Sequence, residues 1–122
     1  MKLHSDHSDV QLVTGYGPGW VSVDKKEHRG NLLIGASGFL RPWNCSGFSD
    51  LNPQHFDALA QLNAELIIFG SGDKIRFVHP AWLQSLMQKR IGFETMDTHA
   101  ACRTYNVLAA EGRNVIAALL LE

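Results

Sequence analysis

The chain has 122 residues, of which 45% are hydrophobic and 19% are charged, and its formal net charge is −1. We expect one domain over residues 1–122, because this length buries a core of its own and the composition argues against disorder. A net charge near zero supplies no basic surface for a phosphate backbone, so we expect no nucleic-acid partner. Cys45 and Cys102 lie far apart in the sequence and predict neither a zinc site nor a secreted disulfide framework.

Residues 1–8 are polar, and we expect them to form a disordered tail. They contain no apolar segment typical of a signal peptide, and the longest apolar run, 115–121, is too short to cross a bilayer. The sequence therefore favours a cytoplasmic protein without membrane insertion. His4, Asp6 and His7 could chelate a metal, but a tail would hold it poorly, so we predict no metal site and no cofactor.

The first part of the chain predicts three strands in a β-meander, at residues 10–13, 20–23 and 31–36. Three glycines and a proline within residues 14–19 supply the backbone dihedrals of a turn, and residues 24–30 form a second, polar turn. Residues 37–51 form a long connection rich in glycine and serine. Its aromatic residues, including Trp43 and Phe48, predict that it packs down over the sheet as an ordered flap.

The remaining chain alternates helical and strand patterns. The predicted elements are a helix from Pro53, a strand at 66–69, a helix at 80–90, a strand at 93–96, a helix at 99–111 and a strand at 115–121. Asn52 is a good N-cap, and Pro53 is tolerated at the first helical position. The runs 66–69 and 115–121 are apolar without alternation, which is typical of strands covered on both faces. We predict an α/β fold: a three-layer single domain with a mixed central sheet, in which the N-terminal β-meander is followed by α-β-α-β-α-β.

Two loops leave the predicted sheet at the carboxyl ends of strands, where ligands bind in open α/β sheets. If these strands are neighbours, the loops face each other across a crevice. Its candidate residues are Gly70, Ser71, Gly72, Asp73, Asp97, Thr98, Cys102, Arg103 and Asn106. The helix N-terminus could bind a small anion there with help from Arg103. Alternatively, caps and turns explain these residues, with Asp97 or Thr98 as the N-cap and Arg103 paired with Asp73 or Asp97.

Cys102 allows two interpretations. A thiol near a helix start has a lowered pKa, and His99 lies three residues earlier, so an aspartate orienting the histidine would complete a Cys-His-Asp arrangement for acyl transfer. A small buried residue beside Ala100 and Ala101 is the alternative, because free cysteine usually behaves as a small hydrophobe. We assign no catalytic residue from the sequence.

Several segments together resemble one family. They are Gly15-Tyr16-Gly17-Pro18, Pro42-Trp43, Ile68-Phe69-Gly70-Ser71-Gly72-Asp73 and the segments at 92–98, 101–106, 111–113 and 117–119. Over nearly its whole length the chain is similar to the small single-domain family that includes the mitochondrial respiratory complex I assembly factor and the adipogenesis-associated domain protein. The resemblance implies a three-layer α/β domain with no established catalytic activity, and a mitochondrial relative that binds partners during assembly of a membrane complex. Without a mitochondrial transit sequence, the chain is expected to be a bacterial, cytoplasmic member.

Two functional hypotheses follow, and neither fixes the oligomeric state. The first is a non-enzymatic protein-interaction or assembly-factor-like domain, linked to respiratory or membrane-complex biogenesis, with an unidentified protein partner. An exposed apolar patch would favour it. The second is a small-molecule (anion) binder or an enzyme that uses the crevice between loops 70–73 and 97–103. An exposed Cys102 and an unpaired Arg103 would favour this alternative.

Overall fold

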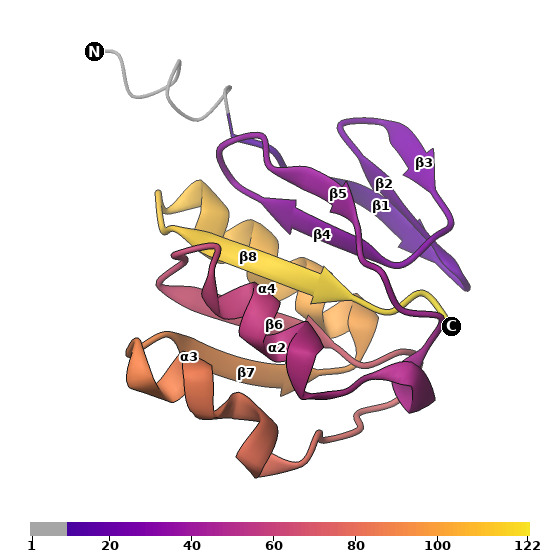
Figure 1. Cartoon of the computed structure of the whole chain (residues 1–122). Helices are drawn as coiled ribbons and strands as arrows, with labels where there is room; N and C mark the ends of the chain where they lie inside the picture. Colours follow the sequence, from indigo (N-terminus) through magenta and orange to yellow (C-terminus); the bar gives the residue numbers. More distant parts are fainter. Residues whose placement is uncertain (1–9) are drawn as a thin grey trace.

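The computed structural model describes residues 10–122, where two sheets and three α-helices form a three-layer α/β arrangement (Figure 1). The expected N-terminal tail and the possible metal ligands His4, Asp6 and His7 lie outside these residues. Helices α2 and α3 cover one face of the larger sheet, and α4 covers the other. None of the helices in the described part of the chain has the length and apolar character needed to cross a membrane.

The larger sheet has five strands in the order β5-β4-β8-β6-β7. These are β4 (Leu32–Gly35), β5 (Leu40–Pro42), β6 (Leu66–Gly70), β7 (Gly92–Met96) and β8 (Val115–Leu119). Strand β6 is parallel to β7 and to β8, whereas β4 is antiparallel to β5 and to β8. The sheet is therefore mixed, as predicted, with the two most apolar strands next to each other at its centre.

Strand β6 is covered on both sides, which explains its uninterrupted apolar sequence. Ile67, Ile68 and Phe69 are fully buried. Ile67 and Phe69 belong to the core cluster under α2 and α3, whereas Ile68 belongs to the cluster under α4. Successive side chains of a strand point to opposite faces of the sheet, so a strand between two helical layers must be apolar at every position.

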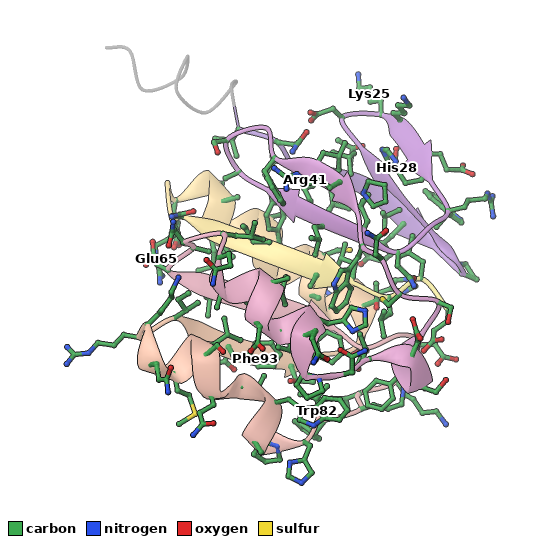
Figure 2. The ribbon with its side chains drawn as sticks, viewed as in Figure 1. Lys25, His28, Arg41, Glu65, Trp82 and Phe93 are labelled. Carbon is green, nitrogen blue, oxygen red and sulfur yellow. The ribbon has the colours of Figure 1, made fainter. Side chains whose placement is uncertain are left out.

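The first helical layer contains α2 (Pro53–Ala60), α3 (Gln84–Gln88) and short 3₁₀ helices at Phe48–Asp50 and Pro80–Leu83. The Asn52 side chain accepts a hydrogen bond from the backbone N–H of Gln54 and caps α2 as predicted. Figure 2 shows Trp82 and Phe93 on this side of the sheet. Residues 37–51 pack down through Trp43, whose ring lies edge-on to Phe69 with the ring centroids 5.9 Å apart.

The second layer combines α4 (Thr98–Ala110) with a small antiparallel sheet of β1 (Val13–Gly17), β2 (Trp20–Val23) and β3 (Lys26–His28). Val21 and Val23 of the small sheet share a core cluster with Cys102 and Tyr105 of α4. The first two strands of the predicted meander therefore supply part of this layer, whereas the third, predicted at 31–36, is β4 and belongs to the larger sheet.

Five segments differ from the prediction, and in the first three hydrogen bonding between strands overrides local composition. Strand β1 runs into the glycine-rich segment 14–19, where Tyr16 pairs with Val21 and Gly17 with Trp20. The predicted polar turn at 24–30 contains β3, and the predicted connection at 37–51 contains β5. The predicted helix at 80–90 is a 3₁₀ helix followed by the short α3, and the last strand ends at Leu119.

Candidate functional site

The loops after β6 and β7 meet, but they bond to each other across the predicted crevice. The Thr98 N–H donates to the Gly72 carbonyl (2.8 Å), and the Gly72 N–H donates to Thr98 Oγ1 (2.9 Å). Thr98 Oγ1 in turn donates to the carbonyl of Leu120 (2.7 Å), and the Thr98 side chain is buried. Thr98 thus joins three segments of the chain and fills the space directly between the loops.

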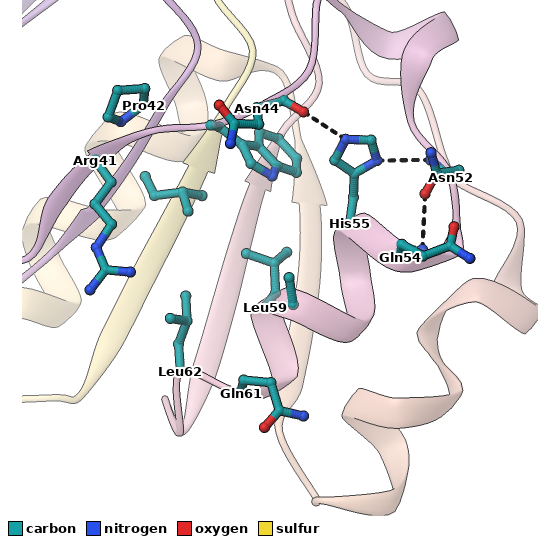
Figure 3. Close-up of a pocket in the computed structure, with 12 residues that line it drawn as sticks. Arg41, Pro42, Asn44, Asn52, Gln54, His55, Leu59, Gln61 and Leu62 are labelled. Carbon is teal, nitrogen blue, oxygen red and sulfur yellow. Dashed lines mark hydrogen bonds between the residues drawn. The ribbon is translucent and has the colours of Figure 1, made fainter.

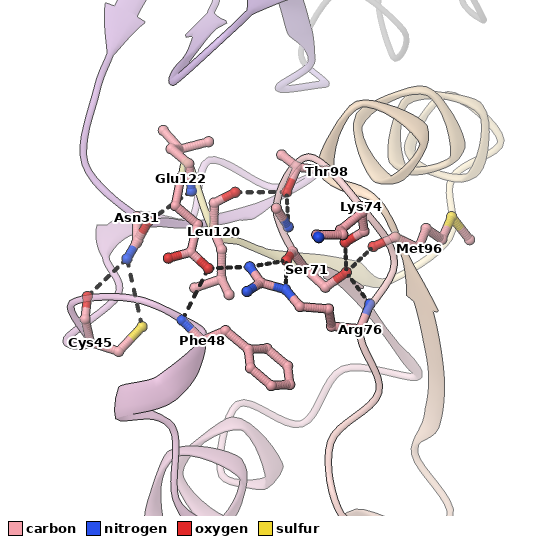
Figure 4. Close-up of polar contacts among 12 residues, drawn as sticks. Asn31, Cys45, Phe48, Ser71, Lys74, Arg76, Met96, Thr98, Leu120 and Glu122 are labelled. Carbon is pink, nitrogen blue, oxygen red and sulfur yellow. Dashed lines mark hydrogen bonds and ion pairs between the residues drawn. The ribbon is translucent and has the colours of Figure 1, made fainter.

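Ser71 is the centre of a second network in the same loop (Figure 4). The Ser71 hydroxyl donates to the carbonyl of Lys74 (2.8 Å) and accepts from the Arg76 N–H (2.8 Å). The Arg76 guanidinium donates to the Ser71 carbonyl and pairs with the Glu122 carboxylate. Every polar group of Ser71 is therefore used in holding the loop, which favours the alternative in which the loop residues are structural.

The N-terminus of α4 is capped by the side chain of Asp97. Asp97 Oδ1 accepts from the Ala100 N–H (3.0 Å), so a carboxylate already occupies the position where an anion would bind. Beside it lies an open cavity of about 320 Å³, bordered among others by Asp73, Thr98 and Glu122. The Asp73 carboxylate at this border repels an anion, whereas the Glu122 carboxylate is paired with Arg76, so anion binding in the crevice stays a prediction that the Asp73 charge does not favour.

Cys102 is fully buried, and burial raises the pKa of its thiol to about 12, with the nearby Asp97 charge adding to the rise against the opposing Arg103. His99 does not orient this thiol. Its Nε2 lies 3.1 Å from the Gly17 carbonyl, and its ring stacks on Tyr16 with the centroids 4.4 Å apart. The geometry therefore matches the expected small buried residue.

Arg103 and Asn106 point to β1 together with His99, from one face of α4. Arg103 Nη1 donates to the Tyr16 hydroxyl (2.8 Å), and that hydrogen bond raises the pKa of the guanidinium. The Asn106 side chain accepts from the Val13 N–H (2.9 Å) and donates to the Val13 carbonyl (2.7 Å). All three side chains fasten the small sheet to the helix. Arg103 and Asn106 do not line the cavity beside the two loops, whereas His99 does.

A larger open cavity of about 580 Å³ lies between α2 and the β4–β5 hairpin (Figure 3). Its lining includes the apolar side chains of Leu33, Leu59 and Leu62. Arg41 also lines the cavity, and the Cζ atom of its guanidinium lies 4.4 Å from the centre of the Phe39 ring. The sequence analysis did not predict this cavity, because its walls come from segments that meet only in the fold.

Two polar side chains at the start of α2, those of Asn52 and His55, are engaged in capping. His55 Nδ1 accepts from the Asn52 N–H (3.1 Å), which places the proton of a neutral ring on Nε2, where it donates to the Asn44 carbonyl (2.8 Å). The spacing Asn52-x-x-His55 is a capping-box signal that the sequence contains but that the sequence analysis did not use. In contrast, no local signal joins Arg76 to Glu122, which lie 46 positions apart.

Large apolar side chains are exposed in the segment between β6 and β7. Ile75 is 50% exposed, Phe77 71% and Met87 70%. Among residues 10–122, no group of three or more histidine, cysteine or carboxylate side chains is placed to hold a metal ion. Exposed apolar side chains are typical of a surface that contacts another protein where they form one contiguous patch.

Residues 13–120 match the family described as "Protein of unknown function (DUF498/DUF598)". The chain belongs to this family. It is 32% identical over 122 aligned residues to the mouse NADH dehydrogenase [ubiquinone] 1 alpha subcomplex assembly factor 3, covering 91% of this chain and 66% of the relative. It is 40% identical over 108 residues to an uncharacterized protein of Rhodobacter capsulatus, covering 88% and 82%.

Among solved structures, a Bordetella parapertussis protein has the same fold, with a TM-score of 0.86 and 32% identity over 93% of this chain and 97% of that one. The similarity to complex I assembly factors confirms the family resemblance drawn from the sequence segments. The chain spans 66% of the length of the mouse relative, so that relative's activity and partners are not transferred with the fold.

Proposed function

We propose that this chain is a non-enzymatic protein-interaction domain that assists the assembly of a respiratory or other membrane complex. The observation that carries the proposal is its similarity, over 91% of its length, to a protein named as an assembly factor of NADH dehydrogenase. The exposed Ile75, Phe77 and Met87 give the domain apolar surface for a protein partner. A bacterial origin and a cytoplasmic location remain predictions.

The geometry around Cys102 also supports a non-enzymatic role over acyl transfer. A thiol that ionises only near pH 12 is protonated at neutral pH, and the nearest histidine side chain in the sequence is bonded elsewhere. Arg103 is likewise engaged with Tyr16 and is not available to a ligand in the crevice. The small-molecule alternative therefore lacks the exposed Cys102 and the unpaired Arg103 that would have favoured it.

Gene deletion in the organism that carries this chain tests the proposal. Membranes from the deletion strain should contain less fully assembled NADH dehydrogenase, measured by native gel electrophoresis, and oxidise NADH more slowly. A plasmid copy of the gene should restore both. A Cys102→Ala copy should restore them equally, because the thiol has no chemical role. Normal levels of the complex in the deletion strain would contradict the proposal. So would a Cys102→Ala copy that fails to restore the complex where the native copy succeeds.

A further inference from the structure

Strand β7 is an edge strand of the larger sheet, and its outer side is open. It pairs with β6 alone. The Gly92 N–H donates to the Glu65 carbonyl (3.0 Å), and the Met96 carbonyl accepts from the Ser71 N–H (2.9 Å). Alternate residues of a parallel strand bond to the same neighbour, so Gly92, Glu94 and Met96 face β6, whereas Phe93 and Thr95 turn their backbone groups outward.

Within residues 10–122, the outward N–H and C=O groups of Phe93 and Thr95 have no hydrogen-bond partner. The other strand edges are protected. Strand β5 has three residues and ends in Pro42, and β3 has three residues that include Lys26 and Glu27. At the edge of β1, the backbone N–H and C=O groups of Val13 are hydrogen-bonded to the side chain of Asn106. Short strands, prolines and charges are the usual means of blocking an edge, and β7 has only one charged residue.

A groove of about 440 Å³ runs along this open edge on the side of α2 and α3. Five of the residues that line it are apolar, namely Phe77, Val78, Pro80, Leu83 and Phe93, and the other two are Glu94 and Thr95 of β7 itself. Phe77 is 71% exposed, although a phenyl ring is strongly favoured in an apolar environment. The groove therefore offers apolar contact next to the unpaired backbone groups.

The two faces of β7 differ in charge. Phe93 and Thr95 lie in register with Ile67 and Phe69, on the face of the groove, and Glu94 lies in register with Ile68, on the face of α4. Glu94 is exposed and forms no ion pair within residues 10–122. An added strand places each of its side chains on the same face as the residue opposite, so it would need apolar residues beside the groove and a cation beside Glu94.

We infer that the outer edge of β7 binds an extended segment of a partner protein, in which apolar residues alternate with a basic residue. The segment adds a sixth strand to the sheet: its backbone pairs with Phe93 and Thr95, its apolar side chains enter the groove, and its basic side chain meets Glu94. Backbone pairing supplies affinity in such strand addition, and the alternating side chains supply specificity. This inference rests on the proposed role as a protein-binding domain and assigns the surface that performs it.

A displayed library of random short peptides, selected on the full chain, tests the inference. The enriched peptides should alternate apolar and basic residues. A selected peptide should slow amide hydrogen exchange at Phe93 and Thr95 by at least about tenfold. It should bind the double variant Phe77→Ser, Glu94→Lys at least about tenfold more weakly than the native chain. Both replaced side chains are exposed, and Val107→Ser on α4 is the matched control, which should bind like the native chain.

Three results of these binding experiments would overturn the inference. They are selection without enrichment, enriched peptides that leave exchange at Phe93 and Thr95 unchanged, and a homodimer in light scattering whose formation alone protects these amides. The last result would assign the edge to a second copy of the chain. The double variant also separates this inference from the proposed function. If it restores complex assembly in the deletion strain as well as the native gene does, the edge is not the working surface, and the assembly role still stands.

Discussion

Replacement of Thr98 by valine tests whether the hydroxyl, and not only the shape of the side chain, holds the two loops together. Valine has nearly the same volume but cannot accept from the Gly72 N–H or donate to the Leu120 carbonyl. Each buried group that loses its partner costs about 1–3 kcal/mol. Two such groups lose their partner here, so the two costs add. We therefore expect Thr98→Val to lower the free energy of unfolding by about 3 kcal/mol, which lies in the lower half of the summed range.

Thr98→Ser is the matched control, because it keeps the hydroxyl and loses one methyl group, which costs about 0.5–1.5 kcal/mol in a packed site. The assay is urea unfolding followed by tryptophan fluorescence and by far-UV circular dichroism, whose coincidence checks for two-state behaviour. A slope of about 2 kcal/mol/M converts the expected loss into a midpoint lower by about 1.5 M. Hydrogen exchange at Gly72 should accelerate only in the valine variant. A valine variant as stable as the serine variant would refute the reasoning.

Further predictions concern three residues in buried or close contacts, Cys102, Asn106 and Gly70. Since burial raises the pKa of the Cys102 thiol to about 12, iodoacetamide should modify it only after unfolding, when the other cysteine is replaced by alanine. Because the folded pKa exceeds the ordinary value of 9.0, the stability linked to this thiol is complete below about pH 9 and declines toward pH 12, and Cys102→Ala should flatten that decline. Asn106→Leu should cost about 1–3 kcal/mol for each of the two backbone groups of Val13 that lose a side-chain hydrogen bond, and it should accelerate hydrogen exchange at Val13. Gly70→Ala should cost about 1–3 kcal/mol in thermal unfolding, because the added Cβ would lie 3.0 Å from the Thr98 Cα, a backbone atom.

Each of these predictions has an opposing result. Rapid alkylation of Cys102 in the folded protein would mean that the thiol is reached by solvent. Unchanged exchange at Val13 in the Asn106 variant would mean that another contact holds β1. Gly70→Ala with native stability would mean that α4 shifts away from β6 at little cost.

The sequence alone predicts the elements whose signals are local. The strand at 66–69 and the last strand are recognisable because burial on both faces requires consecutive apolar residues. The starts of α2 and α4 are recognisable because Asn52 and Asp97 bond to N–H groups only a few positions away. The family is recognisable from short segments, and the match over residues 13–120 confirms it.

Contacts between distant segments account for what the sequence does not reveal. The sequence places Asp97, Thr98, Cys102, Arg103 and Asn106 near one crevice, but the fold distributes them among a cap, a bond between loops, the core and a clamp on β1. That distribution depends on how far β1 extends and on which face of α4 it meets, and neither is encoded in the periodicity of α4.

The open edge of β7 has the same origin. The sequence predicts a strand there, but a strand becomes an edge only through the order in which the chain adds strands to the sheet. Local patterns determine the backbone hydrogen bonds that a segment makes within its own helix or turn, because those partners are a few residues away. The partners of strand backbones and buried hydroxyls lie far along the chain, so only the tertiary structure determines which of them are satisfied and which are left for another molecule.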